Sequence, residues 1–155
     1  MKTIYLITLF LFITHANVQK EYIRNYDNEG HLVSEGWTKN EKKTDFWTFY
    51  YPDGTIEKKG HYYKGKKNGY WYFYTENNNL IKEGTYIANE ANNWWTFYED
   101  NKTVKIQFKN GLKDGYGLIY QNRQLKKAER YEAGKKTGEW TSYIKFRRDN
   151  PHLKF

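Results

Sequence analysis

Tyr70-Trp71-Tyr72-Phe73-Tyr74 is the central copy of an aromatic block that recurs about every 24 residues along this chain. The preceding copy is Phe46–Tyr50 (FWTFY), and the following copy is Trp94–Tyr98 (WWTFY). A fixed period of this length in a short chain is typical of an array of similar supersecondary units. The repeat therefore decides the architecture, and arrays of this kind mostly present binding surfaces.

The register of the repeat follows from three ladders of residues. The last Tyr of each block recurs with steps of 24, 24, 24, 22 and 23, at Tyr26, Tyr50, Tyr74, Tyr98, Tyr120 and Tyr143. Three residues before it stand Trp47, Trp71, Trp95 and Trp140, while Gly117 takes this place in the fourth block. Two residues before each Trp position come Asp45, Gly69, Asn93, Gly115 and Gly138, types that adopt a positive φ at low cost.

Each period predicts two short strands joined by tight turns. Gly69–Thr75 is rich in aromatic residues, which favour a half-buried pleated surface, and Leu80–Tyr86 alternates along one face. Turn chemistry is clear in Pro52-Asp53-Gly54 and in Lys64–Gly69. The repeats have no apolar stripe of 3.6-residue period. We therefore expect an all-β fold over residues 17–144, an elongated single-layer antiparallel meander of about five repeated β-hairpins.

The first 16 residues differ from the repeats. Lys2 precedes the apolar run Ile4–Ile13, and Thr14-His15-Ala16 has small residues spaced like a cleavage site. The run is shorter than the roughly 20 residues that span a bilayer as a helix. These features predict a signal peptide at residues 1–16 and a secreted or periplasmic protein, with a retained membrane anchor as the alternative.

Two further features limit the chemistry of the chain. It contains no Cys, so disulfides, a lipid-anchored lipobox Cys and thiolate metal ligands are excluded. Residues 145–155 are rich in basic side chains, and Pro151 would not pair in a central strand. We expect this segment to be a basic, partly ordered C-terminal tail.

The charge balance is basic, with 26 Lys and Arg against 18 Asp and Glu and a net charge of +8. In a meander, turns of one kind lie along one edge of the sheet. The lysines at these turns are predicted to form a basic rim, and they are Lys66, Lys67, Lys113, Lys135 and Lys136. Such a rim would attract phosphate, lipid headgroups or acidic polysaccharide. Lysines in turns also keep a sheet soluble and protect its edges, so both interpretations stay open.

The repeat resembles the bacterial variant of the MORN repeat, in which Tyr/Phe-x-x-Gly-Lys-x-x-Gly-x-Trp-x-x-Tyr recurs. The matching copies are Tyr62–Tyr74, Phe108–Tyr120 and Tyr131–Tyr143, and the likeness extends from about Tyr22 to Tyr143. Two copies depart from the pattern, because Glu41 and Asp45, then Asn89 and Asn93, replace the glycines. The resemblance implies an elongated twisted sheet of successive hairpins and a scaffolding, membrane-proximal or partner-binding role.

The row of tryptophans has two possible roles. Equivalent positions of successive strands share a face, so Trp47, Trp71, Trp95 and Trp140 are expected on one side of the sheet. Their rings, together with the lysine rim, are candidates for binding a sugar polymer or a partner. The same rings could equally form the core. Gly117 distinguishes the two roles. If the tryptophans form the core, Gly117 leaves a void that neighbouring rings must fill, and if they bind a ligand, the row of binding rings is interrupted there.

Catalytic features are sparse. His31 is expected at a turn and His61 in a strand, and neither belongs to a metal-ligand pair or a serine motif. Glu57, Glu83 and Glu99 are scattered among lysines and fit solvated cross-strand partners.

These observations predict a non-enzymatic scaffold or protein-binding module without cofactor or metal, with an unknown protein as its partner. The alternative is a peripheral binder of anionic lipid headgroups or polysaccharide through the rim and the aromatic face. Export argues against nucleic acid as a partner.

Overall fold

The structure is a computed structural model that describes residues 19–153, and the predicted signal peptide lies outside them. The described residues form 11 strands in one sheet, followed by a short helix. The strands are β1 (Glu21–Tyr26), β2 (Leu32–Lys39), β3 (Lys42–Tyr50), β4 (Ile56–Tyr63), β5 (Lys66–Tyr74), β6 (Leu80–Ile87), β7 (Glu90–Glu99), β8 (Lys102–Lys109), β9 (Leu112–Gln121), β10 (Gln124–Glu132) and β11 (Lys135–Trp140). The helix is α1 (Tyr143–Asp149).

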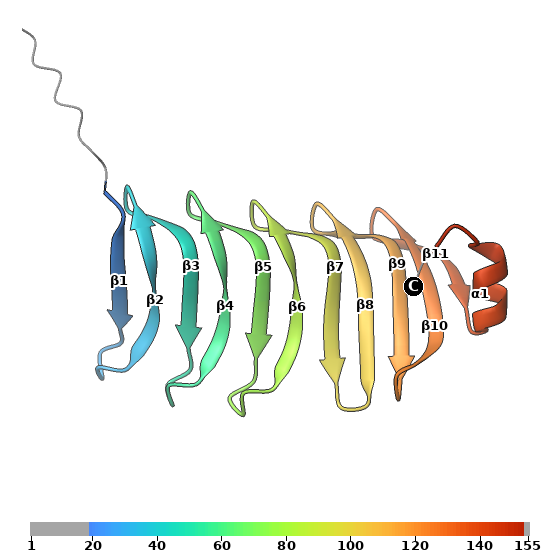
Figure 1. The fold of residues 1–155 in the computed structure, drawn as a ribbon, viewed down its shortest axis with the longest axis horizontal. Helices are drawn as coiled ribbons and strands as arrows, with labels where there is room; N and C mark the ends of the chain where they lie inside the picture. Colours follow the sequence, from blue (N-terminus) through green and yellow to red (C-terminus); the bar gives the residue numbers. More distant parts are fainter. Residues whose placement is uncertain (1–18, 154–155) are drawn as a thin grey trace, which may run out of the picture.

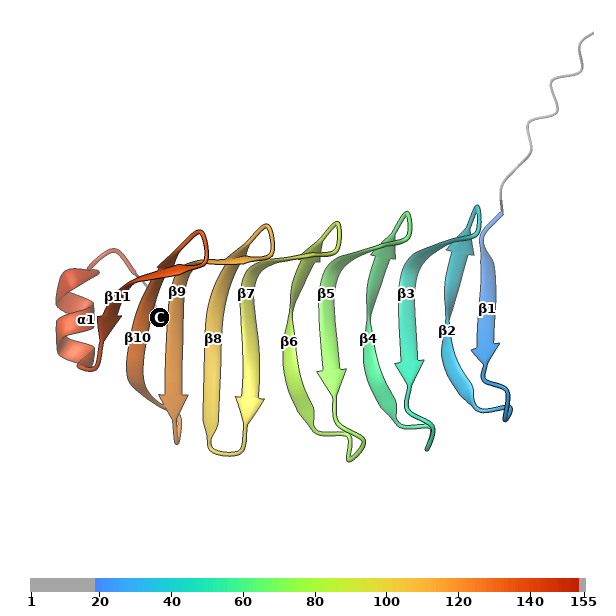
Figure 2. The ribbon, with the colours of Figure 1, turned by 180° about the vertical axis from the view of Figure 1, so that it is seen from behind.

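Every strand pairs antiparallel with its neighbours in sequence, so the strand order in the sheet is the order along the chain. Figure 1 shows an elongated single layer whose hairpin turns alternate between its two long edges, and Figure 2 shows the same arrangement from behind. The predicted all-β, single-layer antiparallel meander is therefore confirmed.

A bulge recurs in the hairpins β2–β3, β4–β5, β6–β7 and β8–β9. In β4–β5, Tyr62 pairs with Lys67 and Gly60 pairs with Trp71, so β5 has two more residues than β4 between these pairs. Gly69 lies in this bulge with φ 85, and Asp45, Asn93 and Gly115 have φ of 55, 59 and 109 at the equivalent positions. The predicted positive φ is thus confirmed in four repeats, whereas Gly138 does not have one.

The pairing defines two faces of the sheet. Trp47, Trp71 and Trp95 lie on one face, which we call the tryptophan face. The residue before each of them points to the opposite side. We call that side the helix face, because α1 packs against it at the C-terminal end of the sheet.

Helix α1 was not predicted, because only seven residues form it and they have a single buried side chain. The Ser142 hydroxyl accepts a hydrogen bond from Lys145 N, which starts the helix. Phe146 is 1% exposed and packs with Tyr116, Leu118 and Ala128 of the sheet. The predicted tail at residues 145–155 therefore begins inside α1, and its first part is ordered by contact with the helix face.

Candidate functional site

The three central tryptophans are core residues. The exposed fractions of Trp47, Trp71 and Trp95 are 0%, 0% and 3%. Each indole lies over a glycine of the preceding strand, because a Cβ built on Gly60 would lie 2.4 Å from Cδ2 of Trp71. Gly36 and Gly84 have the same relation to the other two rings. These tryptophans are thus inaccessible as a stacking platform.

The indole nitrogens donate hydrogen bonds to backbone carbonyls that lie next to the bulges. Nε1 of Trp71 donates to the carbonyl of His61 at 3.0 Å, directly after Gly60 and next to the bulge. Trp47 and Trp95 donate to equivalent carbonyls at 2.8 and 3.0 Å. In the first three repeats the glycine, the bulge and the tryptophan therefore form one structural unit, because the glycine makes room for the ring and the indole nitrogen binds the carbonyl beside the bulge.

Trp140 does not continue the tryptophan row, and the prediction that all four lie on one face is wrong. The bulge of the last hairpin adds only one residue to β11, so Trp140 pairs with Ala128 rather than with Glu129. A shift of one residue moves a side chain to the other face of a sheet. Trp140 consequently lies on the helix face, where it contacts Phe146 at 5.4 Å and donates from Nε1 to Asp149 Oδ2.

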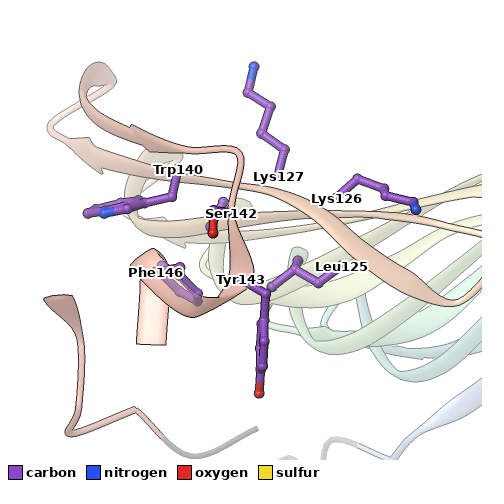
Figure 3. Close-up of a pocket in the computed structure, with 8 residues that line it drawn as sticks. Leu125, Lys126, Lys127, Trp140, Ser142, Tyr143 and Phe146 are labelled. Atoms are coloured by element: carbon purple, nitrogen blue, oxygen red, sulfur yellow. The ribbon is translucent and has the colours of Figure 1, made fainter. Parts of the chain in front are cut away.

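The close-up of this region shows the two faces clearly. In Figure 3 the rings of Trp140 and Phe146 lie near each other on the side of the helix, whereas Lys127 extends away from α1. Lys127 instead forms ion pairs with Glu129 and Glu139, which lie on the tryptophan face. The space enclosed by α1 and β10 is therefore filled by packed side chains.

Gly117 leaves no void in the core. In the earlier repeats the first strand of the pair has the glycine and the second has the large side chain, whereas in the fourth repeat the first strand has the large side chain and the second has the glycine. Ile106 of β8 stands where Gly60 and Gly84 stand in earlier repeats, and it pairs with Gly117 of β9. Ile106 is 8% exposed, and Tyr131 also lies against Gly117. The interruption of the tryptophan row is thus compensated within the core.

The predicted basic rim divides into lysines of different environments. Lys66 and Lys135 are exposed, and each is the first residue of a strand, directly after a hairpin turn. Lys113 folds back over the ring of Tyr131, with Nζ 5.0 Å from its centroid. Lys136 forms ion pairs with Glu139 at 2.5 Å and with Glu129 at 3.6 Å. These side chains therefore do not form one continuous row of free amines.

Lys67, the remaining rim candidate, belongs to the tryptophan face. Its Nζ lies 4.7 Å from the centroid of Trp71, 5.4 Å from that of Phe73 and 4.9 Å from that of Tyr86. Lys43 occupies the equivalent place one repeat earlier, 4.5 Å from Trp47. Amines on this face thus lie over aromatic rings, an arrangement that cation–π attraction stabilises.

An exposed aromatic row on the helix face was not predicted from the sequence. Phe46, Tyr70 and Trp94 directly precede the buried tryptophans, and their exposed fractions are 41%, 41% and 37%. We call these three residues the open row. The signal was present in the sequence, because the residue directly before each of Trp47, Trp71 and Trp95 is aromatic. Alternation along a strand places it on the opposite face.

The next residue of this series is covered rather than open. Tyr116 occupies the equivalent place in β9 but is only 7% exposed, because Phe146 of α1 packs edge-on against it at 5.9 Å. Its hydroxyl donates to Oδ1 of the buried Asn150 at 2.6 Å. A groove next to this covered position reaches Trp94 of the open row, and it is lined by Trp94, Thr96, Lys105, Gln107, Tyr116, Leu118, Tyr120 and Leu153.

Tyrosine–glutamate pairs connect strands across the sheet. The hydroxyl of Tyr50 donates to Glu35 Oε1 at 2.7 Å, and that of Tyr98 donates to Glu83 Oε1 at 2.6 Å. Burial and then the bond to Glu35 raise the pKa of Tyr50 to about 12. The bonds from Tyr50 and Arg24 lower the pKa of Glu35.

This pair predicts a loss of stability in alkali. The pKa of Tyr50 rises from 10.0 to about 12 on folding, so its contribution is complete below pH 10 and disappears as the pH approaches 12. Urea unfolding of the wild type at about pH 9 and about pH 11.5, on either side of the unfolded pKa, should show a fall in the free energy of unfolding. The fall should be smaller in Tyr50→Phe, and an equal fall in both proteins would contradict this role.

The histidines of residues 19–153 lie apart from any group of metal-ligand side chains. No group of three or more His, Cys, Asp or Glu side chains in this part of the chain could hold a metal ion. His31 lies at a turn beside Asp27, with Nδ1 3.2 Å from Oδ2, and His61 lies in β4 against Phe46. Within the same residues, no helix has the length and apolar character needed to cross a membrane.

The site assembled from these residues is therefore a pair of unlike faces. The tryptophan face has a buried aromatic core with lysine amines above it. The helix face has an open aromatic row, and α1 packs against the sheet at the C-terminal end of this face. Comparison of the chain with protein-family models and with curated proteins finds no family model and no curated sequence that matches it.

Proposed function

We propose that this chain is a non-enzymatic scaffold that binds a partner protein through the open row of its helix face. The observation that carries this proposal is the contrast between Tyr116, which α1 covers, and Trp94, which lies uncovered at the equivalent place of the preceding repeat. Exposed apolar surface that adjoins a packed helix is typical of a protein interaction site.

The contacts between α1 and Tyr116, the covered residue that follows the open row, indicate the chemistry of the partner. Phe146 supplies an aromatic ring, and Asn150 accepts from the Tyr116 hydroxyl. A partner segment of the same kind, with an aromatic anchor and a polar group, fits beside α1 over Trp94 and Tyr70. Large aromatic residues of this type often dominate binding energies at protein interfaces.

The sequence offers two supporting arguments. The repeats resemble the bacterial MORN-repeat variant, which implies scaffolding and partner-binding roles. The apolar run in residues 1–16 favours export, so we place the proposed partner in the periplasm or outside the cell.

Capture experiments with single-residue variants test this proposal. Trp94→Ser should lose a partner that the wild-type protein recovers from the cell envelope, while its thermal unfolding changes little. Tyr26→Ser is a matched control, because Tyr26 is 57% exposed but lies in β1, away from the open row. Equal recovery of every bound protein by the wild type and both variants would contradict the proposal.

A further inference from the structure

Four lysine amines lie over the tryptophan face in two pairs, and each pair shares one phenylalanine ring. Nζ of Lys43 and Nζ of Lys58 lie 4.8 and 5.0 Å from the centroid of Phe49. One repeat later, Nζ of Lys67 and Nζ of Lys82 lie 5.4 and 4.7 Å from the centroid of Phe73. These two groups are named the first and second amine pairs.

The positive charge of the pairs is only partly compensated by carboxylates. Lys58 forms an ion pair with Glu57 at 2.9 Å, whereas no carboxylate in residues 19–153 forms an ion pair with Lys43, Lys67 or Lys82. Burial, followed by repulsion from Lys58, lowers the pKa of Lys43. Burial and repulsion from Lys58 and Lys82 lower the pKa of Lys67, and attraction by Glu57 opposes only part of this shift. An anion placed between the amines would therefore relieve an existing repulsion.

The two pairs have a defined spacing along the sheet. Equivalent residues of β3 and β5, or of β4 and β6, are separated by two strand intervals, which is about 10 Å. The next repeat ends the series, because Ala91 and Val104 stand at the positions of Lys67 and Lys82 around Phe97. The four amines thus form a row that extends over one repeat, in which Lys58 also repels Lys67 of the second pair, and an uncharged copy of the same framework follows.

We propose that the tryptophan face binds a linear acidic polysaccharide that carries one carboxylate or sulfate per disaccharide. The spacing of the amine pairs is similar to the length of an extended disaccharide, so successive anionic groups reach successive pairs. Two ammonium groups donate to each anion, and charge-assisted hydrogen bonds of this kind are the stronger ones. The half-buried edges of Phe49 and Phe73 provide apolar contact for the sugar rings between them.

Other polyanions fit this face less well. A membrane surface is bound most firmly where apolar side chains insert next to basic ones, but Phe49, Tyr62, Phe73 and Tyr86 are half-buried beneath the amines. Single-stranded nucleic acid binds by stacking bases on open ring faces. The ring faces here are already occupied by Nζ atoms. The polysaccharide site is distinct from the proposed protein-binding row, which lies on the opposite face.

Binding of a hyaluronate octasaccharide, which has one carboxylate per disaccharide, tests the proposal in the full chain. Lys67→Gln with Lys82→Gln should weaken binding at low salt on the order of tenfold, as expected for two ion pairs. Lys66→Gln with Lys135→Gln is the matched control, because it removes the same charge from the exposed first residues of β5 and β11. Equal weakening in both double variants would overturn the proposal, as would the absence of binding to the wild type.

A second variant, designed to bind the octasaccharide more tightly, tests the proposal even if Lys67→Gln with Lys82→Gln unfolds. Ala91→Lys with Val104→Lys adds a third amine pair around Phe97 and should tighten binding of the octasaccharide but not of a disaccharide. Unchanged affinity for the octasaccharide would overturn the proposal. So would tighter binding, at equal anion concentration, to phosphatidylserine vesicles or to an oligothymidylate than to the octasaccharide.

Discussion

Replacement of Trp71 by alanine is expected to lower the free energy of unfolding by about 3–5 kcal/mol. Trp71 is fully buried, and its ring contacts Tyr62, Phe73 and Tyr86 at centroid distances of 5.2, 6.1 and 6.2 Å. The substitution also leaves the carbonyl of His61 without its indole donor. Chemical unfolding monitored by circular dichroism measures the effect.

Trp94→Ala is the matched control for Trp71→Ala. Trp94 belongs to the open row on the helix face, where its side chain is 37% exposed. Its removal should cost much less stability, because exposed side chains contribute less buried area. Equal stability of the wild type and Trp71→Ala would show that Trp71 is not part of the core.

Gly60→Ala is expected to lower the free energy of unfolding by about 1–3 kcal/mol, the cost of overpacking a tightly packed site. The added Cβ would lie 2.4 Å from Cδ2 of Trp71, so the indole must move away from the strand and from its bond to the His61 carbonyl. Differential scanning calorimetry and urea unfolding would both report the loss.

Gly117→Ala is the control for Gly60→Ala. It tests whether the loss of stability comes from the clash with the Trp71 ring or from any replacement of a buried glycine in this sheet by alanine. Gly117 is buried, but the atom nearest to a Cβ at this position would be the ring carbon Cε2 of Tyr131 at 3.1 Å, which can shift slightly. The stability of this variant should stay within about 1 kcal/mol of the wild type. The cost of Gly60→Ala should also shrink in a Trp71→Ala background, and full additivity of the two changes would contradict the clash.

The repeat period was enough to predict the sheet, because turn residues and aromatic strands recur in one register. The pairing of Gly60 with Trp71 depends on the same register, so the core of the first three repeats follows from it. The position of Trp140 could not be predicted in this way. It depends on whether a bulge adds one residue or two, and that difference leaves the spacing of Trp140 from Tyr143 unchanged.

The candidate sites were predictable only in part. Lys66 and Lys67 are adjacent and were assigned to the same rim, yet one extends from a turn and the other lies over Trp71. Strand alternation separates them, but the path of a long flexible side chain follows from the rings around it. Helix α1 was missed for a related reason, since Phe146 is its one buried residue and Tyr116 is far away in sequence.

Ile106 and Gly117 reverse the order of glycine and large residue found in the earlier repeats, and we expect this reversal to divide the sheet into two cooperative units. The chain of ring contacts on the tryptophan face runs from Trp47 to Phe108, whereas the cluster of Tyr116, Leu118, Ala128 and Phe146 lies on the helix face. The backbone ladder is continuous across β8 and β9, but the apolar core changes sides there. In a repeat array, stability is set by each unit and its nearest neighbours. We therefore expect the sheet to contain two units that exchange amide hydrogens with different opening free energies, with their border between β8 and β9.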